Sequence, residues 1–300
     1  MTRLADLAEL VRAPAALSVP GDVLAGAAAA GALGRRTPAL AAASVLLYWA
    51  GMAANDWADR RLDATERPER PIPSGRVRPA VALGLAGGLT AAGLAVATAA
   101  GGRHAATVAL PLAATIWGYD LSAKDTTAGP AVMAACRGLD VLLGATGGRT
   151  ARALPAALTV AAHTWTVTAL SRREVTGAAD RRLPAFTLAG TALIALAAPG
   201  RPDVLSGAPS STECVRKGPF LRLGPAALAA GYAVRYGRAQ ARVLADPSPA
   251  RVRAAVGAGI TGLPALQGAL TARAGAGLLG LAVAAAAPLG RRLARLVSPT

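Results

Sequence analysis

Long apolar stretches separated by short arginine-rich segments recur along this chain. Residues 79–101 and 154–170, for example, contain no Asp, Glu, Lys or Arg. A helix of about 20 apolar residues is long enough to cross the hydrocarbon core of a bilayer. A segment in lipid must also satisfy its own backbone hydrogen bonds, which a helix does. The pattern therefore predicts an all-α fold, a polytopic membrane helix bundle.

The ends of the apolar segments mark the expected helices. The eighth segment carries arginines at positions 235, 238 and 242, and the tenth is short. We therefore expect about nine transmembrane helices, with ten as the alternative, around a central cavity in a single domain over residues 1–300. The ten segments are residues 14–33, 37–57, 79–101, 104–121, 130–148, 154–170, 183–199, 223–245, 254–271 and 275–290.

The low share of charged residues and the positions of the basic ones are typical of a membrane protein. Only 16% of residues are charged, against about 25% in soluble domains. The net charge of +16 could suit nucleic acid, but the basic residues lie between apolar segments, where they set topology. About twice as many fall on the side of the N-terminus as on the other, which predicts a cytoplasmic N-terminus. We expect a multi-pass protein of a bacterial plasma membrane with no nucleic-acid partner.

The junction after the second segment carries four polar residues in a helical spacing. Asn55, Asp59 and Asp63 are four apart, and Asp56 is three residues before Asp59. Like charges on one helix face repel unless a cation lies between them. Mg²⁺ suits such hard oxygen ligands, because it binds through one or two carboxylates together with substrate phosphates.

Arginines in a proline-rich segment follow these acids. Arg67 and Arg70 stand within the run Arg-Pro-Glu-Arg-Pro-Ile-Pro-Ser-Gly. Guanidinium groups bind phosphate oxygens in a bidentate manner. The run Asn-Asp-x-x-Asp-x-x-x-Asp, followed by Arg-x-x-Arg-Pro-Ile-x-x-Gly, resembles the first signature of the UbiA superfamily of intramembrane prenyltransferases. The resemblance implies that the Asp-rich motif binds an isoprenyl diphosphate through Mg²⁺, and that an acceptor captures the allylic cation formed when the diphosphate leaves.

The junction after the fourth segment adds Tyr119, Asp120 and Lys124. It resembles the Tyr and Lys stretch that closes the fourth helix in many relatives. A lysine at a helix end is a mobile point charge suited to a diphosphate. The alternative is a lysine whose charge simply reaches the membrane interface.

The junction after the sixth segment departs from the family pattern. Relatives usually carry a second Asp-x-x-x-Asp here, whereas this chain has Arg172, Arg173 and Glu174. Glu174 is the nearest carboxylate candidate for a metal. Arg172 or Arg173 would instead neutralise part of the diphosphate directly.

Charges inside the apolar segments need partners, because a lone charge in hydrocarbon is costly. Arg137 and Asp140 are three residues apart, and we expect them to pair on one helix face or to serve in the pocket. Asp22 has Asn55 or Arg137 as candidate neighbours. His163 is expected to be a buried hydrogen-bond donor between helices, with a catalytic base as the alternative.

Taken together, these residues predict Mg²⁺-dependent transfer of a prenyl group from an isoprenyl diphosphate to a small lipophilic acceptor, aromatic acceptors included. The alternative is a UbiA-like protein that binds or transports an isoprenoid without catalysis. The expected metal ligands are Asp56, Asp59, Asp63 and Glu174, and Lys124 joins the three aspartates in catalysis. The expected substrate-binding residues are Asn55, Arg67, Arg70, Tyr119, Asp120, Arg137, Arg172, Arg173 and Glu174.

Overall fold

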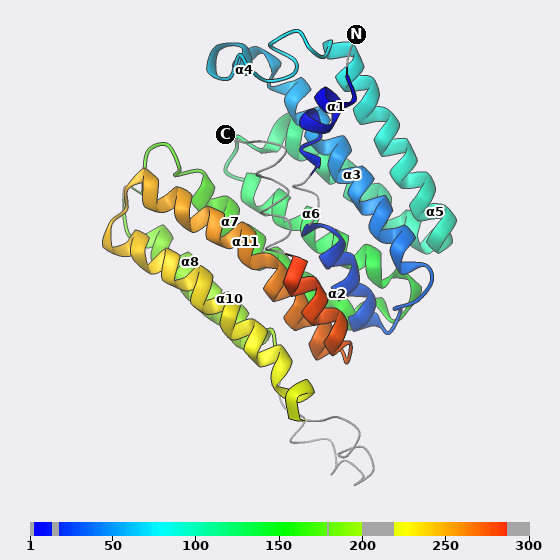
Figure 1. The fold of residues 1–300 in the computed structure, drawn as a ribbon, viewed down its shortest axis with the longest axis vertical. Coiled ribbons are helices and arrows are strands. Elements are labelled where there is room, and N and C mark those ends of the chain that lie inside the picture. Colours follow the sequence, from blue (N-terminus) through cyan, green and yellow to red (C-terminus); the bar gives the residue numbers. More distant parts are fainter. Residues whose placement is uncertain (1–2, 14–17, 179, 200–218, 287–300) are drawn as a thin grey trace. The chain divides into compact units, whose positions relative to one another are not determined.

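The structure is a computed structural model that describes residues 3–13, 18–178, 180–199 and 219–286. Throughout these residues the chain forms helices and turns and no strand, as the all-α prediction requires (Figure 1). The labelled helices are α1 (Leu4–Leu10), α2 (Pro20–Ala30), α3 (Thr37–Ala58), α4 (Arg60–Glu66), α5 (Pro79–Gly118), α6 (Gly129–Gly144), α7 (Thr150–Ser171), α8 (Arg182–Ala197), α10 (Pro219–Ala245) and α11 (Pro249–Arg273), and a short apolar helix, Gly277–Ala286, follows α11. A π-helix, η2 (Tyr119–Ala123), follows α5, and a 3₁₀ turn, η3 (Ala145–Gly147), follows α6.

Three of the described helices are long and apolar enough to cross a membrane. They are Thr37–Ala58, the continuous run Pro79–Ala123, and Thr150–Ser171. The count of nine or ten transmembrane helices stays a prediction. The third and fourth predicted segments are the two halves of α5, which is interrupted at Gly102 by a positive φ of 62°. Glycine adopts this conformation without the steric penalty of a side chain.

The described chain divides into two compact units. Unit 1 lies within residues 1–157 and unit 2 within residues 158–287. The single domain expected over residues 1–300 stays a prediction. Each unit is described by itself below.

Unit 1 is built from α2, α3, α5 and α6. α3 packs along α5, and α2 packs along α6. The buried core between them is rich in alanine and leucine, with Leu47 and Leu112 among its largest side chains. At Gly26 an added Cβ would lie 1.7 Å from the carbonyl oxygen of Val141, so only glycine allows α2 and α6 to approach this closely. Such small residues are typical of helix packing in membranes.

Unit 2 is built from α8, α10, α11 and the C-terminal part of α7. α10 packs against both α8 and α11. Its interior contains uncharged polar side chains: His163 Nδ1 lies 2.9 Å from the hydroxyl of Tyr232, and Gln240 donates to Thr191 at 2.6 Å. His163 is therefore a buried hydrogen-bond partner between helices, as expected. Hydrogen bonds of this kind hold helices together where no water can compete.

Candidate active site

The helical spacing of the first motif continues through the end of α3. The backbone N–H of Asp59 donates to Asn55 O at 2.9 Å, and the N–H of Asp63 donates to Asp59 O at 2.8 Å. α4 therefore begins almost where α3 ends, and the three residues follow one another at successive turns. Asp56 and Asp63 are buried, while Asp59 is partly exposed.

The loop after α4 places two arginines beside these acids. Arg70 Nη1 donates to Asp63 Oδ2 at 2.7 Å and lies 3.5 Å from Asp56 Oδ1. Arg67 Nη1 lies 3.6 Å from the other carboxylate oxygen of Asp63. Because the Asp63 side chain is only 1% exposed, the charge of a carboxylate there needs these cations close by.

The second junction lies at the same end of unit 1. Lys124 forms an ion pair with Asp59, and Asn55 Nδ2 donates to Asp120 Oδ1 at 3.3 Å. The π-helical turn η2 carries Asp120 and directly precedes Lys124. Short π-helical turns are frequent at functional sites, where they re-aim side chains. The two junctions, 65 residues apart in sequence, thus form one connected polar cluster.

Tyr119 contributes to a small cavity beneath this cluster. The cavity has a volume of about 30 Å³ and is lined by Tyr48 of α3, Cys136 of α6, and Tyr119 and Asp120 of η2, among others. A volume of this size accommodates one or two water molecules. Polar hydroxyl and carboxyl groups on its wall give such waters hydrogen-bond partners.

Sequence reasoning missed Arg12 as a member of the cluster. Its Nη2 donates to Asp56 Oδ1 at 2.8 Å, across 44 residues of sequence. Arg12 has a left-handed φ of 46°, which is uncommon for a residue with a side chain. α1, just before it, is fixed by Arg76, which donates to Asp6 at 2.9 Å and to Glu9 at 2.6 Å. The i, i+3 spacing of Asp6, Glu9 and Arg12 was the available signal in the sequence.

The structure gives Arg137 a different ion-pair partner from the expected Asp140. Its Nε lies 2.7 Å from Asp22 Oδ2 of α2, and Asp140 accepts a hydrogen bond from Ser44 of α3. Arg137 also lies over the ring of Tyr48, 5.4 Å from its centroid. The expectation that Asp22 has Arg137 as a neighbour is confirmed. Because both charges are buried, the pair ties α2 to α6 inside the bundle.

The cluster has the donor chemistry for a divalent metal. In the part of the chain that the structure describes, no group of three or more Asp, Glu, His or Cys side chains is placed to hold a metal ion by itself. Instead, Asp56, Asp59 and Asp63 each face a guanidinium or ammonium group. Mg²⁺ needs only one or two protein carboxylates when substrate phosphates supply further oxygens. The aspartates therefore fit a metal that arrives with a diphosphate, and their present cations mark where positive charge is favoured.

The third junction belongs to unit 2. Arg172 and Arg173 are exposed, and Glu174 is half-buried. Arg253 of α11 donates to the backbone oxygen of Glu174 at 2.9 Å. Partial burial raises the pKa of the Glu174 carboxyl, and the nearby Arg253 opposes that rise. The roles of Arg172, Arg173 and Glu174 toward a substrate or metal stay predictions.

Curated relatives match part of this chain. A stretch of 80 residues is 42% identical to a digeranylgeranylglyceryl phosphate synthase from Methanothrix thermoacetophila, covering 26% of this chain and 30% of that protein. A stretch of 118 residues is 38% identical to a protein of the same name from Ignicoccus hospitalis, covering 39% of each. The matches thus span less than half the length of these relatives.

Solved structures and a family model extend the similarity. A structure from a study of digeranylgeranylglyceryl phosphate synthase in membranes has a TM-score of 0.66 at 16% identity, covering 91% of this chain and 99% of that one. The apo structure of a UbiA homolog from Aeropyrum pernix K1 has a TM-score of 0.60 at 18% identity, covering 88% and 96%. These two show the fold. The model of the UbiA prenyltransferase family matches residues 19–182, more than half of the chain and nearly all of the charged cluster at the end of α3, so the chain belongs to the UbiA prenyltransferase family.

Proposed function

We propose that this protein transfers a prenyl group from an isoprenyl diphosphate to a small lipophilic acceptor within the membrane. The observation that carries the proposal is the polar cluster at the end of α3, where Asp56, Asp59 and Asp63 meet arginines and a lysine. In the reaction, the bond between the prenyl carbon and the diphosphate oxygen breaks, and the diphosphate leaves with the bonding electrons. A nucleophilic atom of the acceptor then bonds to that carbon and loses its proton.

The side chains of the cluster have distinct roles in this proposal. Arg67, Arg70 and Lys124, joined by Arg12, bind phosphate oxygens of the donor, while Asn55 orients Asp120. Asp56, Asp59 and Asp63 would hold Mg²⁺, which would supply positive charge to the leaving diphosphate when bound. Fixed cations in a water-poor site stabilise the charge that develops there without reorganising.

The names of the curated relatives guide the choice of the first donor and acceptor to test. Both curated relatives are named digeranylgeranylglyceryl phosphate synthases. Their name describes a glyceryl phosphate that carries two geranylgeranyl groups. We therefore propose geranylgeranyl diphosphate as the first donor to test and a geranylgeranylglyceryl phosphate as the first acceptor, with lipophilic aromatic acceptors as the comparison.

Product analysis tests the proposal. The purified protein in lipid nanodiscs is incubated with geranyl, farnesyl or geranylgeranyl diphosphate, each acceptor and Mg²⁺, and the products are identified by mass spectrometry. A prenylated acceptor that disappears on adding EDTA is the expected result. Donor binding without any prenylated product would support the non-catalytic alternative, which the two arginines of the third junction, Arg172 and Arg173, favour.

The orientation in the membrane is part of the proposal. We place the N-terminus and the cluster on the cytoplasmic side, because the basic residues are biased toward that side. Ser74, in the loop after α4, and Gly34, between α2 and α3, are both exposed. In a background lacking Cys136 and Cys214, a membrane-impermeant thiol reagent added to intact cells should label Gly34→Cys and miss Ser74→Cys. Labelling of Ser74→Cys alone would invert the orientation.

A further inference from the structure

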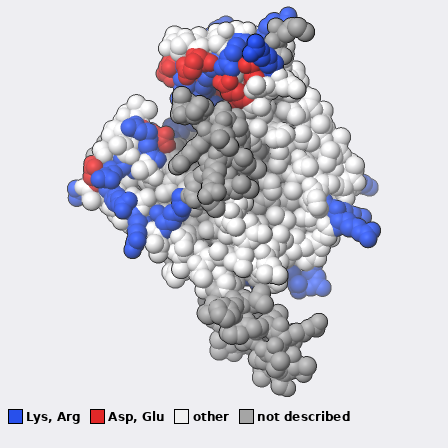
Figure 2. Space-filling view, in the orientation of Figure 1, with Lys and Arg blue, Asp and Glu red and all other residues white. Residues whose placement is uncertain are grey.

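The end of unit 1 where α3 begins is basic and carries no acid. The three segments that meet there, residues 31–36, 101–104 and 145–153, contain no Asp or Glu. Their arginines are Arg35, Arg36, Arg103, Arg149 and Arg152. Among the residues that the structure describes, none of these five side chains takes part in an ion pair, and the basic residues near the start of α3 lie apart from the acidic ones (Figure 2). This end therefore has positive charge that none of the described acidic residues balances.

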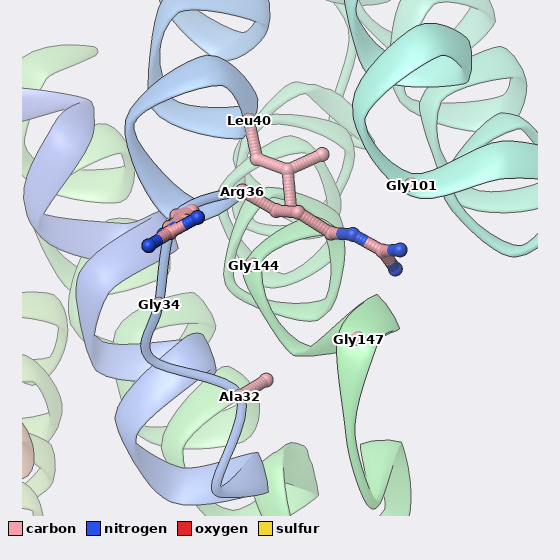
Figure 3. A pocket seen from close by; sticks show the side chains of 8 residues that line it. Ala32, Gly34, Arg36, Leu40, Gly101, Gly144 and Gly147 are labelled. Atoms are coloured by element: carbon pink, nitrogen blue, oxygen red, sulfur yellow. The ribbon is translucent and has the colours of Figure 1, made fainter.

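A pocket of about 230 Å³ lies among these segments. Its lining includes Arg35 and Arg36 together with the four glycines at positions 34, 101, 144 and 147. Figure 3 shows the side chain of Arg36 reaching across the pocket, with its guanidinium between Gly101 and Gly147. The volume is below the range of about 300–1,000 Å³ typical of drug-sized ligands, so the pocket suits a compact group.

The backbone around the pocket is held by specific hydrogen bonds. α2 ends at Gly31, whose φ of 69° turns the chain toward the pocket. The N–H of Gly34 donates to Thr37 Oγ1 at 3.0 Å, which fixes the loop that carries the two arginines. The N–H of Arg149 donates to Ala30 O at 3.0 Å and joins the segment after η3 to the end of α2. The pocket is thus formed by backbone that these hydrogen bonds hold in place, and Arg35 and Arg36 belong to its lining.

The chemistry of the pocket indicates a phosphate. Guanidinium groups bind phosphate oxygens through paired hydrogen bonds and keep their charge at all physiological pH values. Gly34 leaves space next to them, because a Cβ added there would meet no atom within 4 Å. α3 and α5 are apolar helices that lead away from this end. Where such helices leave the hydrocarbon core, lipid phosphates lie at the same level.

We propose that this pocket binds the phosphate headgroup of an anionic membrane lipid. The lipid balances the charge of Arg35 and Arg36 at the end of unit 1 remote from the acidic cluster. A free phosphate or diphosphate has the same chemistry, but it lacks acyl chains to lie along the apolar helices that begin at the pocket. The position at the ends of apolar helices therefore favours a lipid.

Native mass spectrometry of the full-length protein in detergent measures the binding directly. The probes are dioleoyl phosphatidylglycerol, dioleoylglycerol, which has the same chains without phosphate, and inorganic phosphate as a competitor. We expect the wild type to retain phosphatidylglycerol and not dioleoylglycerol. The double variant Arg35→Gln/Arg36→Gln should bind phosphatidylglycerol about 30-fold more weakly, from the loss of two basic residues near the phosphate.

Matched variants separate the pocket from general surface charge. Arg103→Gln/Arg152→Gln removes the same charge from the same end but changes no residue that lines the pocket, so its binding should equal that of the wild type. Gly34→Leu keeps every charge and adds a bulky side chain at a residue that lines the pocket, so it should lose binding, whereas Gly84→Leu, at an exposed position of α5, should not.

Three results would overturn the proposal. Equal loss in both double variants would mean that only surface charge attracts the lipid. Unchanged binding in Arg35→Gln/Arg36→Gln and Gly34→Leu would remove the pocket as the site. Full competition by millimolar inorganic phosphate would assign the pocket to a free anion instead of a lipid.

Discussion

The two ends of unit 1 are both rich in arginine, but their arginines have different surroundings. At the end of α3, Arg12, Arg67 and Arg70 each lie within 3.6 Å of a carboxylate oxygen. Where α3 begins, Arg35 and Arg36 face a pocket without any acid in its lining. At the end of α3, the arginines already neutralise buried carboxylates. When a metal-bound diphosphate arrives, these arginines can bind its phosphate oxygens in place of the carboxylates. Cations without a carboxylate can only be balanced by an anion from outside the protein.

The burial of the aspartates explains why arginines lie beside them at the end of α3. The side chains of Asp56 and Asp63 are 5% and 1% exposed, and a charged carboxylate so far from water is stable only beside cations. Arg70 contacts both of them, so it links the end of α3 to α4. At the other end the arginines are exposed and solvated, and their positions cost the fold little.

The largest expected effect is a loss of turnover when an aspartate at the end of α3 is changed. Asp59→Asn should abolish prenyl transfer, lowering turnover by about 100-fold or more, because it removes one carboxylate from the metal and the ion-pair partner of Lys124. Turnover is measured by product mass spectrometry at saturating donor. Glu66→Gln, an exposed acid of α4, is the control and should keep wild-type activity. Normal turnover of Asp59→Asn would remove the aspartates from the proposed metal site.

The features predicted well from the sequence were local ones. Within the described residues every apolar segment contains helix, and the break between residues 101 and 104 coincides with the positive φ at Gly102. The helical spacing from Asn55 to Asp63 is retained through two consecutive helices. Periodicity and glycine placement act over a few residues, so they can be identified in the sequence alone.

The pairing of distant residues could not be predicted in the same way. Arg137 had a candidate three residues away in Asp140, yet it pairs with Asp22, 115 positions earlier in the sequence. Arg12 was not among the predicted site residues, although it contacts Asp56. Which of several carboxylates a buried arginine meets depends on how helices pack. That packing is determined by close approaches such as Gly26 against Val141, which carry no charge signal.

Substitutions at the third junction test whether Glu174 contributes to diphosphate binding together with the aspartates at the end of α3. If Glu174 is a ligand, Glu174→Gln should weaken diphosphate binding or turnover by about 2–5 kcal/mol, typical of losing one charged contact. Asp180→Asn, an exposed acid of the same loop, is the matched control. Binding is measured by calorimetry with a non-hydrolysable donor analogue. A loss below about 1 kcal/mol is what a solvated surface charge gives, and it would restrict the site to the first two junctions.

Stability should also differ between the ends. Arg70→Ala leaves the buried Asp63 with only the more distant Arg67, and should lower the free energy of unfolding by about 1–3 kcal/mol. Arg36→Ala, at the exposed end, should change it by less than about 0.5 kcal/mol. Thermal unfolding of the two variants in the same detergent compares them directly. Equal losses in the free energy of unfolding would show that the ion pairs of Arg70 with carboxylates do not stabilise the end of α3.

The smallest effect concerns the attachment of α1, which brings Arg12 to Asp56. A hydrogen bond from the backbone N–H of Arg3, followed by the Arg76 side chain, holds the pKa of Asp6 below its usual value of 3.8. A carboxyl whose pKa is lowered by folding stabilises the folded state above its usual pKa and loses that contribution as the pH falls through the lowered value. The wild type should therefore be slightly more stable than Asp6→Asn at pH 6, and the difference should shrink as the pH falls below 3.8 and through the lowered pKa. A pH-independent gap between the wild type and Asp6→Asn would show that the Asp6 carboxylate is not what fixes α1.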